Sequence, residues 1–158
     1  MKTTLTRKPN AFSLIELLMV LTIISIMAAL IINAFANASQ DSRDVIARQQ
    51  QAVLKSALDN MISQYMVSGN TVAKARKYYM YTDADPAKAK LTMKQRLALL
   101  EPYLDEDTYI HLFSRSTDTA IQSAAMVKTG QFIEFEDWPA ATAANRNTYP
   151  KVKLSDLP

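Results

Sequence analysis

Glu16 is the residue whose type and position most clearly predict a chemical role, because it is the only charged side chain in an apolar stretch. The stretch runs from Phe12 to Ile32 and its 21 residues read FSLIELLMVLTIISIMAALII. A carboxylate within such a helix costs about 2.5 to 3.5 kcal/mol on insertion scales if it is central and unpaired. We therefore expect Glu16 either to pair with a positive charge or to reach the aqueous interface.

Other residues that could do catalytic or metal chemistry do not form a recognisable arrangement. His111 is the only histidine and the chain has no cysteine, so we interpret His111 as a residue of a strand over Tyr109–Phe113 rather than as a ligand. Ser114 and Ser116 follow it without the spacing of a nucleophile elbow or a catalytic triad. We expect no enzymatic activity, no catalytic residue, no metal and no cofactor.

The acidic residues of the C-terminal half are better explained as solvent-exposed groups than as a calcium or acid-base site. Asp83 and Asp85, and the Asp-Glu-Asp run at 105–107, lack the glycine and the terminal glutamate of an EF-hand loop. Glu134 and Glu136 would share one face of a strand, without any indication of a cleft beside them. We interpret these groups as solvated turns and strand surface.

One segment interleaves basic and aromatic residues, a composition that can bind single-stranded nucleic acid by phosphate contact and stacking. Its members are Lys74, Arg76, Lys77, Tyr78, Tyr79, Tyr81, Lys88, Lys90, Lys94 and Arg96. Asp83 and Asp85 interrupt it. The chain has 18 Lys+Arg against 15 Asp+Glu, and loss of Lys2, Arg7 and Lys8 would leave 15 against 15. We therefore interpret the segment as solvated surface and expect no nucleic-acid partner.

A single long helix is the element that must position Glu16. No proline occurs between Pro9 and Pro86, and the first glycine is Gly69, so residues 11–68 contain neither helix breaker. Residues 12–32 reach the length of about 20 residues that crosses a bilayer. We predict one unbroken helix from about Leu14 to about Val67, ended by Gly69 and Asn70.

The second half of this helix is amphipathic. An apolar stripe recurs at helical spacing in Leu54, Leu58, Met61, Ile62 and Tyr65. The opposite face carries Asp44, Arg48, Lys55 and Asp59. We expect the stripe to pack against a globular head.

The remaining segment, residues 69–158, should form that head. We predict a helix capped by Thr92 and ending near Pro102, the strand over Tyr109–Phe113, and a hairpin that joins residues 123–128 to residues 131–136 through Thr129 and Gly130. In the second hairpin strand, Phe132 and Glu134 would face one side and Ile133 and Phe135 the other. From Trp138 onward we expect an irregular tail.

The predicted fold class is therefore α+β, with a long N-terminal α-helix (transmembrane, then amphipathic) packed on a small C-terminal head that holds a short antiparallel sheet. The expected domains are a basic leader at residues 1–11, the long helix at 12–68, membrane-spanning to about residue 32, and the head at 69–158.

The segment Ala11-Phe12-Ser13-Leu14-Ile15-Glu16 resembles the cleavage and methylation motif of type IV prepilins and type II secretion pseudopilins. It combines a short basic leader, a small residue before the cut, phenylalanine after it, glutamate five residues into the mature chain and a long apolar helix. The resemblance implies that prepilin peptidase cuts between Ala11 and Phe12 and methylates the new Phe12 amine. It also implies a structural subunit of a type IV pilus-like or type II secretion pseudopilus filament, in which Glu16 pairs with the Phe12 amine of a neighbour.

The chain departs from the family pattern at two positions. Ala11 stands where members usually carry glycine, and Ile31 to Ala34 contains no helix-loosening proline. The missing cysteine pair favours a pseudopilin-like or short-pilin head. We expect slower cleavage than with glycine.

The resemblance also implies a location and a set of partners. Lys2, Arg7 and Lys8 should keep the N-terminus cytoplasmic and export the rest, giving a single-pass inner-membrane protein with a periplasmic head, and then a periplasmic or cell-surface filament. The partners would be prepilin peptidase, other copies and related pilin subunits, inner-membrane lipid and an inner-membrane assembly platform.

Two alternatives stay open. The chain could be a secreted globular protein whose ordinary signal peptide is cut after Ala36 or Ala38, where small-x-small sites occur. It could also be a pilin-like subunit of a DNA-uptake fibre. Against the first, Glu16 interrupts the would-be signal core and the helical pattern continues past the cut.

Overall fold

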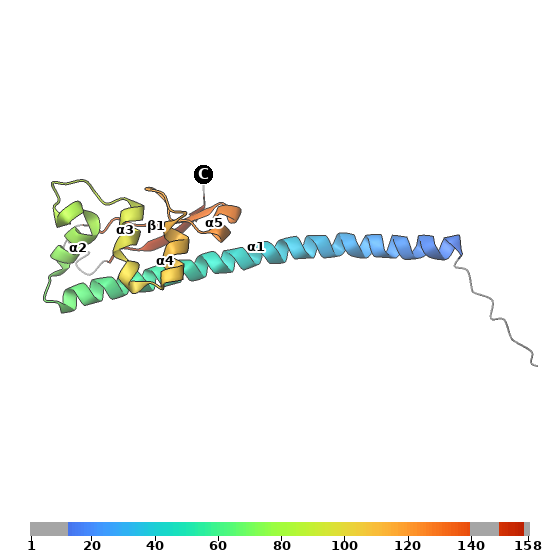
Figure 1. Ribbon diagram of the computed structural model, residues 1–158, viewed down its shortest axis with the longest axis horizontal. Coiled ribbons are helices and arrows are strands. Elements are labelled where there is room, and N and C mark those ends of the chain that lie inside the picture. Colours follow the sequence, from blue (N-terminus) through green and yellow to red (C-terminus); the bar gives the residue numbers. More distant parts are fainter. Residues whose placement is uncertain (1–12, 140–148, 157–158) are drawn as a thin grey trace, which may run out of the picture. The chain divides into compact units, whose positions relative to one another are not determined.

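The computed structural model describes residues 13–139 and 149–156 of the 158-residue chain (Figure 1). Its elements are α1 (Leu14–Val67), α2 (Val72–Met80), η1 (Thr82–Ala84), α3 (Met93–Leu99), η2 (Glu101–Tyr103), α4 (Glu106–Phe113), α5 (Ala124–Thr129), β1 (Gln131–Phe135) and β2 (Val152–Asp156). The chain divides between Ser39 and Gln40 into two compact units, the N-terminal unit and the C-terminal unit.

The fold class is α+β, as predicted, with a long N-terminal helix and a two-stranded antiparallel sheet. α1 is a single 54-residue helix from Leu14 to Val67, which confirms the predicted unbroken helix. Its end also follows the prediction, since Gly69 adopts a left-handed φ of +80° and Asn70 donates a hydrogen bond to the Tyr65 carbonyl at 3.3 Å. Residues 11–68 contain neither glycine nor proline, which permits this continuity.

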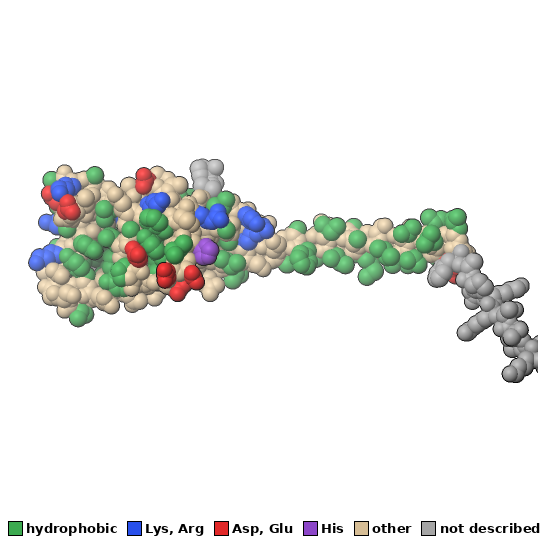
Figure 2. Space-filling model, in the orientation of Figure 1, with side chains coloured by type: hydrophobic (Ala, Val, Ile, Leu, Met, Phe, Trp, Pro, Cys, Tyr) green, Lys and Arg blue, Asp and Glu red, His purple; other side chains and the backbone are tan. Residues whose placement is uncertain are grey.

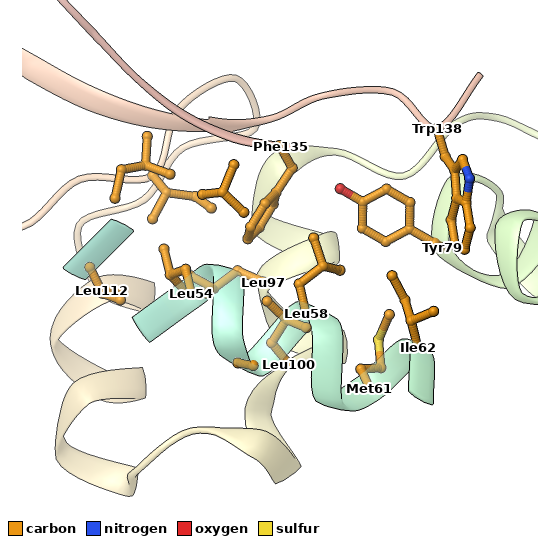
Figure 3. Close-up of a cluster of buried hydrophobic side chains, with 14 of the residues drawn as sticks. Leu54, Leu58, Met61, Ile62, Tyr79, Leu97, Leu100, Leu112, Phe135 and Trp138 are labelled. Atoms are coloured by element: carbon orange, nitrogen blue, oxygen red, sulfur yellow. The ribbon is translucent and has the colours of Figure 1, made fainter. Parts of the chain in front are cut away.

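The C-terminal unit packs its core on the apolar stripe of α1. Leu54, Leu58, Met61 and Ile62 are buried, and Tyr65 is half-buried against the same core, as the spacing predicted. Figure 3 shows the four buried side chains in one cluster with Tyr79, Leu97, Phe135 and Trp138. The helix therefore supplies one wall of the hydrophobic core.

Two further predictions for the C-terminal unit are confirmed. Thr92 caps α3 in a capping box, in which its hydroxyl accepts from the Gln95 N–H and the Gln95 side chain accepts from the Thr92 N–H. The helix ends at Leu99, close to Pro102. In β1, Ile133 and Phe135 are buried while Phe132 and Glu134 are not, so the strand alternates as predicted.

The strand predicted over Tyr109–Phe113 is wrong, because these residues belong to helix α4. Asp105 caps this helix by accepting from the Thr108 N–H at 3.3 Å, and two carboxylates follow in the first turn, where the helix dipole favours negative charge. This local start signal outweighs the β-branched and aromatic composition of the segment. His111 consequently lies on an exposed helix position instead of a strand.

The hairpin prediction is wrong in its first half. Residues 124–129 form α5, which Ser123 caps and Gly130 ends at a left-handed φ of 72°. Thr129 and Gly130 thus end a helix instead of turning between strands. β1 pairs with β2, from Gln131 opposite Asp156 to Phe135 opposite Val152. The partner strand lies in the segment predicted to be irregular.

The end of β1 is fastened to the core by Arg96, a charged residue that is only 2% exposed. Its guanidinium donates to the Phe135 carbonyl at 3.1 Å and to an Asp137 carboxylate oxygen at 2.7 Å. Lys90 contacts the other oxygen of Asp137 at 2.7 Å. The Arg96 guanidinium also lies over the Tyr79 ring. One half-exposed carboxylate therefore compensates a buried cation.

This arrangement predicts acid sensitivity of the C-terminal unit. Hydrogen bonds from Lys90 and Arg96 hold the pKa of Asp137 below its ordinary value of 3.8. The unfolded chain therefore binds the proton more readily, so this stabilisation is present above about pH 4 and is lost as the pH falls toward the folded pKa. We expect the urea midpoint, followed by Trp138 fluorescence, to fall between pH 5 and pH 3. The fall should be smaller in Asp137→Asn, and an equal fall in both proteins would contradict this assignment.

Candidate functional site

The start of α1 is closed by reciprocal hydrogen bonds between Ser13 and Glu16. The Ser13 hydroxyl accepts from the Glu16 N–H at 3.3 Å, and Glu16 Oε2 accepts from the Ser13 N–H at 2.9 Å. The Ser13 carbonyl accepts the first helical bond, from the Leu17 N–H at 3.2 Å. These contacts form a capping box. They satisfy two N–H groups that a helix start otherwise leaves without partners.

This geometry gives Glu16 a role within its own chain that we did not predict. The carboxylate lies in the first turn, where the helix dipole favours a negative charge. Its hydrogen bond to Ser13 does not neutralise that charge, and no cation lies within 4 Å of Glu16 in the part of the chain that the structure describes. The site therefore holds a capped but uncompensated carboxylate.

The other polar side chains that follow along the apolar part of α1 satisfy themselves. Thr22 donates to the Met19 carbonyl at 2.8 Å, and Ser25 donates to the Leu21 carbonyl at 2.7 Å. Such bonds to the preceding turn let hydroxyls enter an apolar environment at little cost. From Leu14 to Ile32, Glu16 is thus the side chain whose charge no contact within the described residues neutralises.

Hydrophobic side chains cover the described part of the N-terminal unit (Figure 2). From Leu14 to Ile32 the large apolar residues are 46% exposed or more. By length and composition α1 qualifies as a membrane-crossing helix. Lipid or other apolar surfaces would have to cover these side chains.

Two of the predicted site residues, Ala11 and Phe12, lie outside the described residues. The structure joins Ser13 and Glu16 by two hydrogen bonds, and this contact was not predicted from the sequence. The signal was present, since serine followed three residues later by glutamate before an apolar run is typical of a capping box.

The C-terminal unit gives the other candidate residues structural positions. Ser116 is buried and donates to the Leu112 carbonyl at 2.7 Å, and Ser114 donates to the His111 carbonyl at 3.3 Å. Asp83 pairs with Lys88 at 2.6 Å, and Asp85 accepts from the Ala87 N–H. Within residues 13–139 and 149–156 no group of three or more His, Asp or Glu could hold a metal ion.

The basic and aromatic segment is divided between core and surface. Tyr79 is buried, and its pKa is raised because burial disfavours the charged phenolate. Arg96 is buried beside it. Lys74, Lys77 and Tyr78 stay at the surface of α2. The ten residues therefore do not form one continuous binding surface.

Comparison with known proteins identifies one family model. Residues 6–32 match the prokaryotic N-terminal methylation motif, the signature of type IV pilins and pseudopilins. The matched range contains the proposed cut, the capping box and the apolar part of α1. No curated protein and no solved structure is significantly similar to the chain.

Proposed function

We propose that this chain, which carries the methylation signature of pilins and pseudopilins, is the precursor of a filament subunit that is cut between Ala11 and Phe12 and methylated on the Phe12 amine. The observation that carries the proposal is the match of residues 6–32 to the methylation motif, together with an apolar helix that begins directly behind the cut. The processing enzyme would be prepilin peptidase. The partners would be further copies, related subunits and an inner-membrane assembly platform.

In this proposal the N-terminal helix serves first as a membrane anchor and then as the filament core. Lys2, Arg7 and Lys8 precede the apolar stretch, and positive charges favour the cytoplasmic side, so the C-terminal unit would be exported. In a filament, apolar helices of neighbouring subunits would replace the lipid. Nothing in this step requires an enzymatic activity of the chain itself.

Glu16 would couple processing to assembly. Cleavage creates an amine at Phe12, and the positively charged amine of a neighbouring subunit could pair with the negatively charged Glu16 carboxylate. Two opposite charges in an environment of low dielectric attract strongly, whereas the unpaired carboxylate is costly there. Pairing would therefore favour the assembled state over the isolated processed subunit.

The N-terminal residue of the mature protein tests the proposal. We expect mass spectrometry of the membrane-bound protein to find Phe12 at the N-terminus, with one added methyl group. A mature chain beginning at Asn37 or Ser39 would instead establish the ordinary signal peptide and refute the proposal. The same sample from cells without prepilin peptidase should retain residues 1–11.

A truncated protein tests whether the C-terminal unit folds without the N-terminal unit. A chain beginning near Ser39 lacks the exposed apolar surface of the N-terminal unit but keeps the buried stripe of α1. We expect it to be monomeric in size-exclusion chromatography and to unfold cooperatively by circular dichroism. Aggregation or loss of cooperative unfolding would mean that the C-terminal unit depends on the deleted residues.

A further inference from the structure

α2 presents a basic face for which the described chain supplies no counter-charge. Lys74, Lys77 and Tyr78 lie three and four residues apart, so they share one side of the helix. Both lysines are exposed, and neither has a carboxylate within 4 Å among the described residues. Tyr78 is 38% exposed and stacks on Tyr65 with ring centroids 5.1 Å apart, which holds the aromatic ring beside the two lysines.

The residues before and at the start of α4 carry the opposite charge. Glu101, Asp105, Glu106 and Asp107 are exposed, and within the described ranges none of them forms an ion pair. Figure 2 shows a group of acidic side chains on the visible face of the C-terminal unit, at the place that α4 occupies in Figure 1. The same unit thus exposes two unpaired patches of opposite sign.

The two patches lie at different heights along α1 and do not neutralise each other within one chain. α4 lies over α1 at Val53, which lines one hollow together with Asp107 and His111. α2 lies beside α1 at Tyr65, through the stacked ring of Tyr78. Twelve residues of helix separate Val53 from Tyr65, a rise of about 18 Å. That distance is far beyond the reach of a direct ion pair.

We propose that the basic face of α2 on one subunit binds the acidic start of α4 on a neighbouring copy in the filament. This inference rests on the proposed function, because neighbouring subunits of a helical filament share one polarity and are related by a rotation and a shift along the filament axis. A shift on the order of 18 Å brings α2 of one copy level with α4 of the next. A contact between two unlike patches is heterologous, so it propagates along a filament instead of closing a dimer.

Charge complementarity favours a second copy over nucleic acid as the occupant of this face. Burial of Tyr79 in α2 and of Arg96 in α3 reduces the exposed basic and aromatic surface of this part of the chain. A polyanion requires several phosphate contacts, and the chain without its leader has 15 Lys+Arg against 15 Asp+Glu. A protein surface with three or four carboxylates matches two lysines more closely.

Charge reversal on each side, followed by their combination, tests the contact in the full-length protein. One variant combines Lys74→Glu with Lys77→Glu, and a second combines Glu106→Lys with Asp107→Lys. Each should lower the ratio of sheared filament to membrane-bound processed subunit by about tenfold or more, which corresponds to a coupling energy of about 1.4 kcal/mol. The quadruple variant, which carries all four substitutions, restores opposite charges and should return the ratio to within about threefold of wild type.

The matched control for the lysine reversal is Lys128→Glu with Lys151→Glu, which changes the net charge by the same amount and in the same direction at two other exposed lysines. This variant should assemble like wild type. Trp138 fluorescence during heating checks that every variant folds. Lys74→Glu is a mild change locally, since Thr71 caps α2 three residues earlier and would gain a capping-box partner. Unchanged filament yield in both charge-reversal variants, or no recovery in the quadruple variant, would refute the proposed contact.

A cross-link gives a second, direct measurement, because the chain has no cysteine of its own. Lys77→Cys and Asp107→Cys in the same chain, treated in filaments with a short bis-maleimide, should give a ladder of covalent multimers. Either substitution alone should give no ladder beyond dimers. Filaments without a ladder would refute this contact alone, whereas absence of wild-type filaments would refute the proposed function.

A DNA-binding measurement tests the other occupant of this face. If the protein binds a single-stranded DNA 30-mer, and if Lys74→Glu with Lys77→Glu abolishes that binding, the face would be assigned to nucleic acid instead.

Discussion

Glu16→Leu is expected to leave membrane insertion and cleavage after Ala11 intact while filaments disappear. Leucine suits the bilayer at least as well as glutamate, so export should not suffer. The substitution removes the charge that would pair with the Phe12 amine of a neighbour. If pairing offsets the 2.5 to 3.5 kcal/mol cost of the lone carboxylate, its loss corresponds to about two orders of magnitude in assembly. The measurement compares processed subunit in membranes with sheared or pelleted filament.

The capping box makes Glu16→Gln the necessary companion of this experiment. Leucine removes both the charge and the hydrogen bond to the Ser13 N–H, whereas glutamine keeps an acceptor oxygen for the cap and removes only the charge. Equal failure of both variants would attribute assembly to the charge. Normal assembly with glutamine and failure with leucine would attribute it to the cap, and normal yield from both would refute the role of Glu16 in assembly.

The long helix could be predicted because its determinants are local. The absence of glycine and proline from Ala11 to Ser68, the apolar run to Ile32 and the stripe from Leu54 are all features of the local sequence. The observed helix, Leu14 to Val67, follows these signals. Capping residues also act locally, and Thr92 was identified for that reason.

The errors in the C-terminal unit come from competing local signals and from a distant partner. The segment Tyr109–Phe113 has a strand-like composition, but the cap at Asp105 starts a helix four residues earlier. Phe135 and Val152 are paired although they lie seventeen positions apart in the sequence, and nothing local in the tail indicates which strand it joins. Strand pairing depends on tertiary contacts more than helix formation does.

The candidate site was predictable in part. Glu16 could be singled out because a charge in an apolar run is rare in any helix, and the methylation motif supports the resemblance that gave it a role. Ser13 was missed although its spacing to Glu16 is a known helix-start pattern. Arg96 was missed for another reason, since its place in a basic run indicated solvent exposure and only the fold brings Asp137 to it.

Among the surface carboxylates of the C-terminal unit, Asp137 is the one whose removal we expect to lower the free energy of unfolding most, because it pairs with the buried Arg96. Asp137→Ala leaves a guanidinium that is 2% exposed without its counter-charge. Removing one partner of a fully buried pair costs about 3 to 5 kcal/mol. Because the Asp137 side chain is itself 52% exposed, water screens part of this interaction, and we expect about 2 kcal/mol. Urea unfolding of the full chain in detergent, followed by fluorescence of the single, buried Trp138, measures it.

A double-mutant cycle separates the buried charge from the lost contact. Arg96→Met removes the cation together with its need for a partner, and Asp137 then keeps Lys90. Once Arg96 is methionine, Asp137→Ala should cost less than about 1 kcal/mol, because only an exposed pair is lost. Glu136→Ala, which breaks the ion pair with the exposed Lys153, is the control and should cost less than Asp137→Ala does in the wild-type background, because it leaves no buried charge without a partner. Equal costs of Asp137→Ala in both backgrounds would show that the buried guanidinium does not depend on this carboxylate.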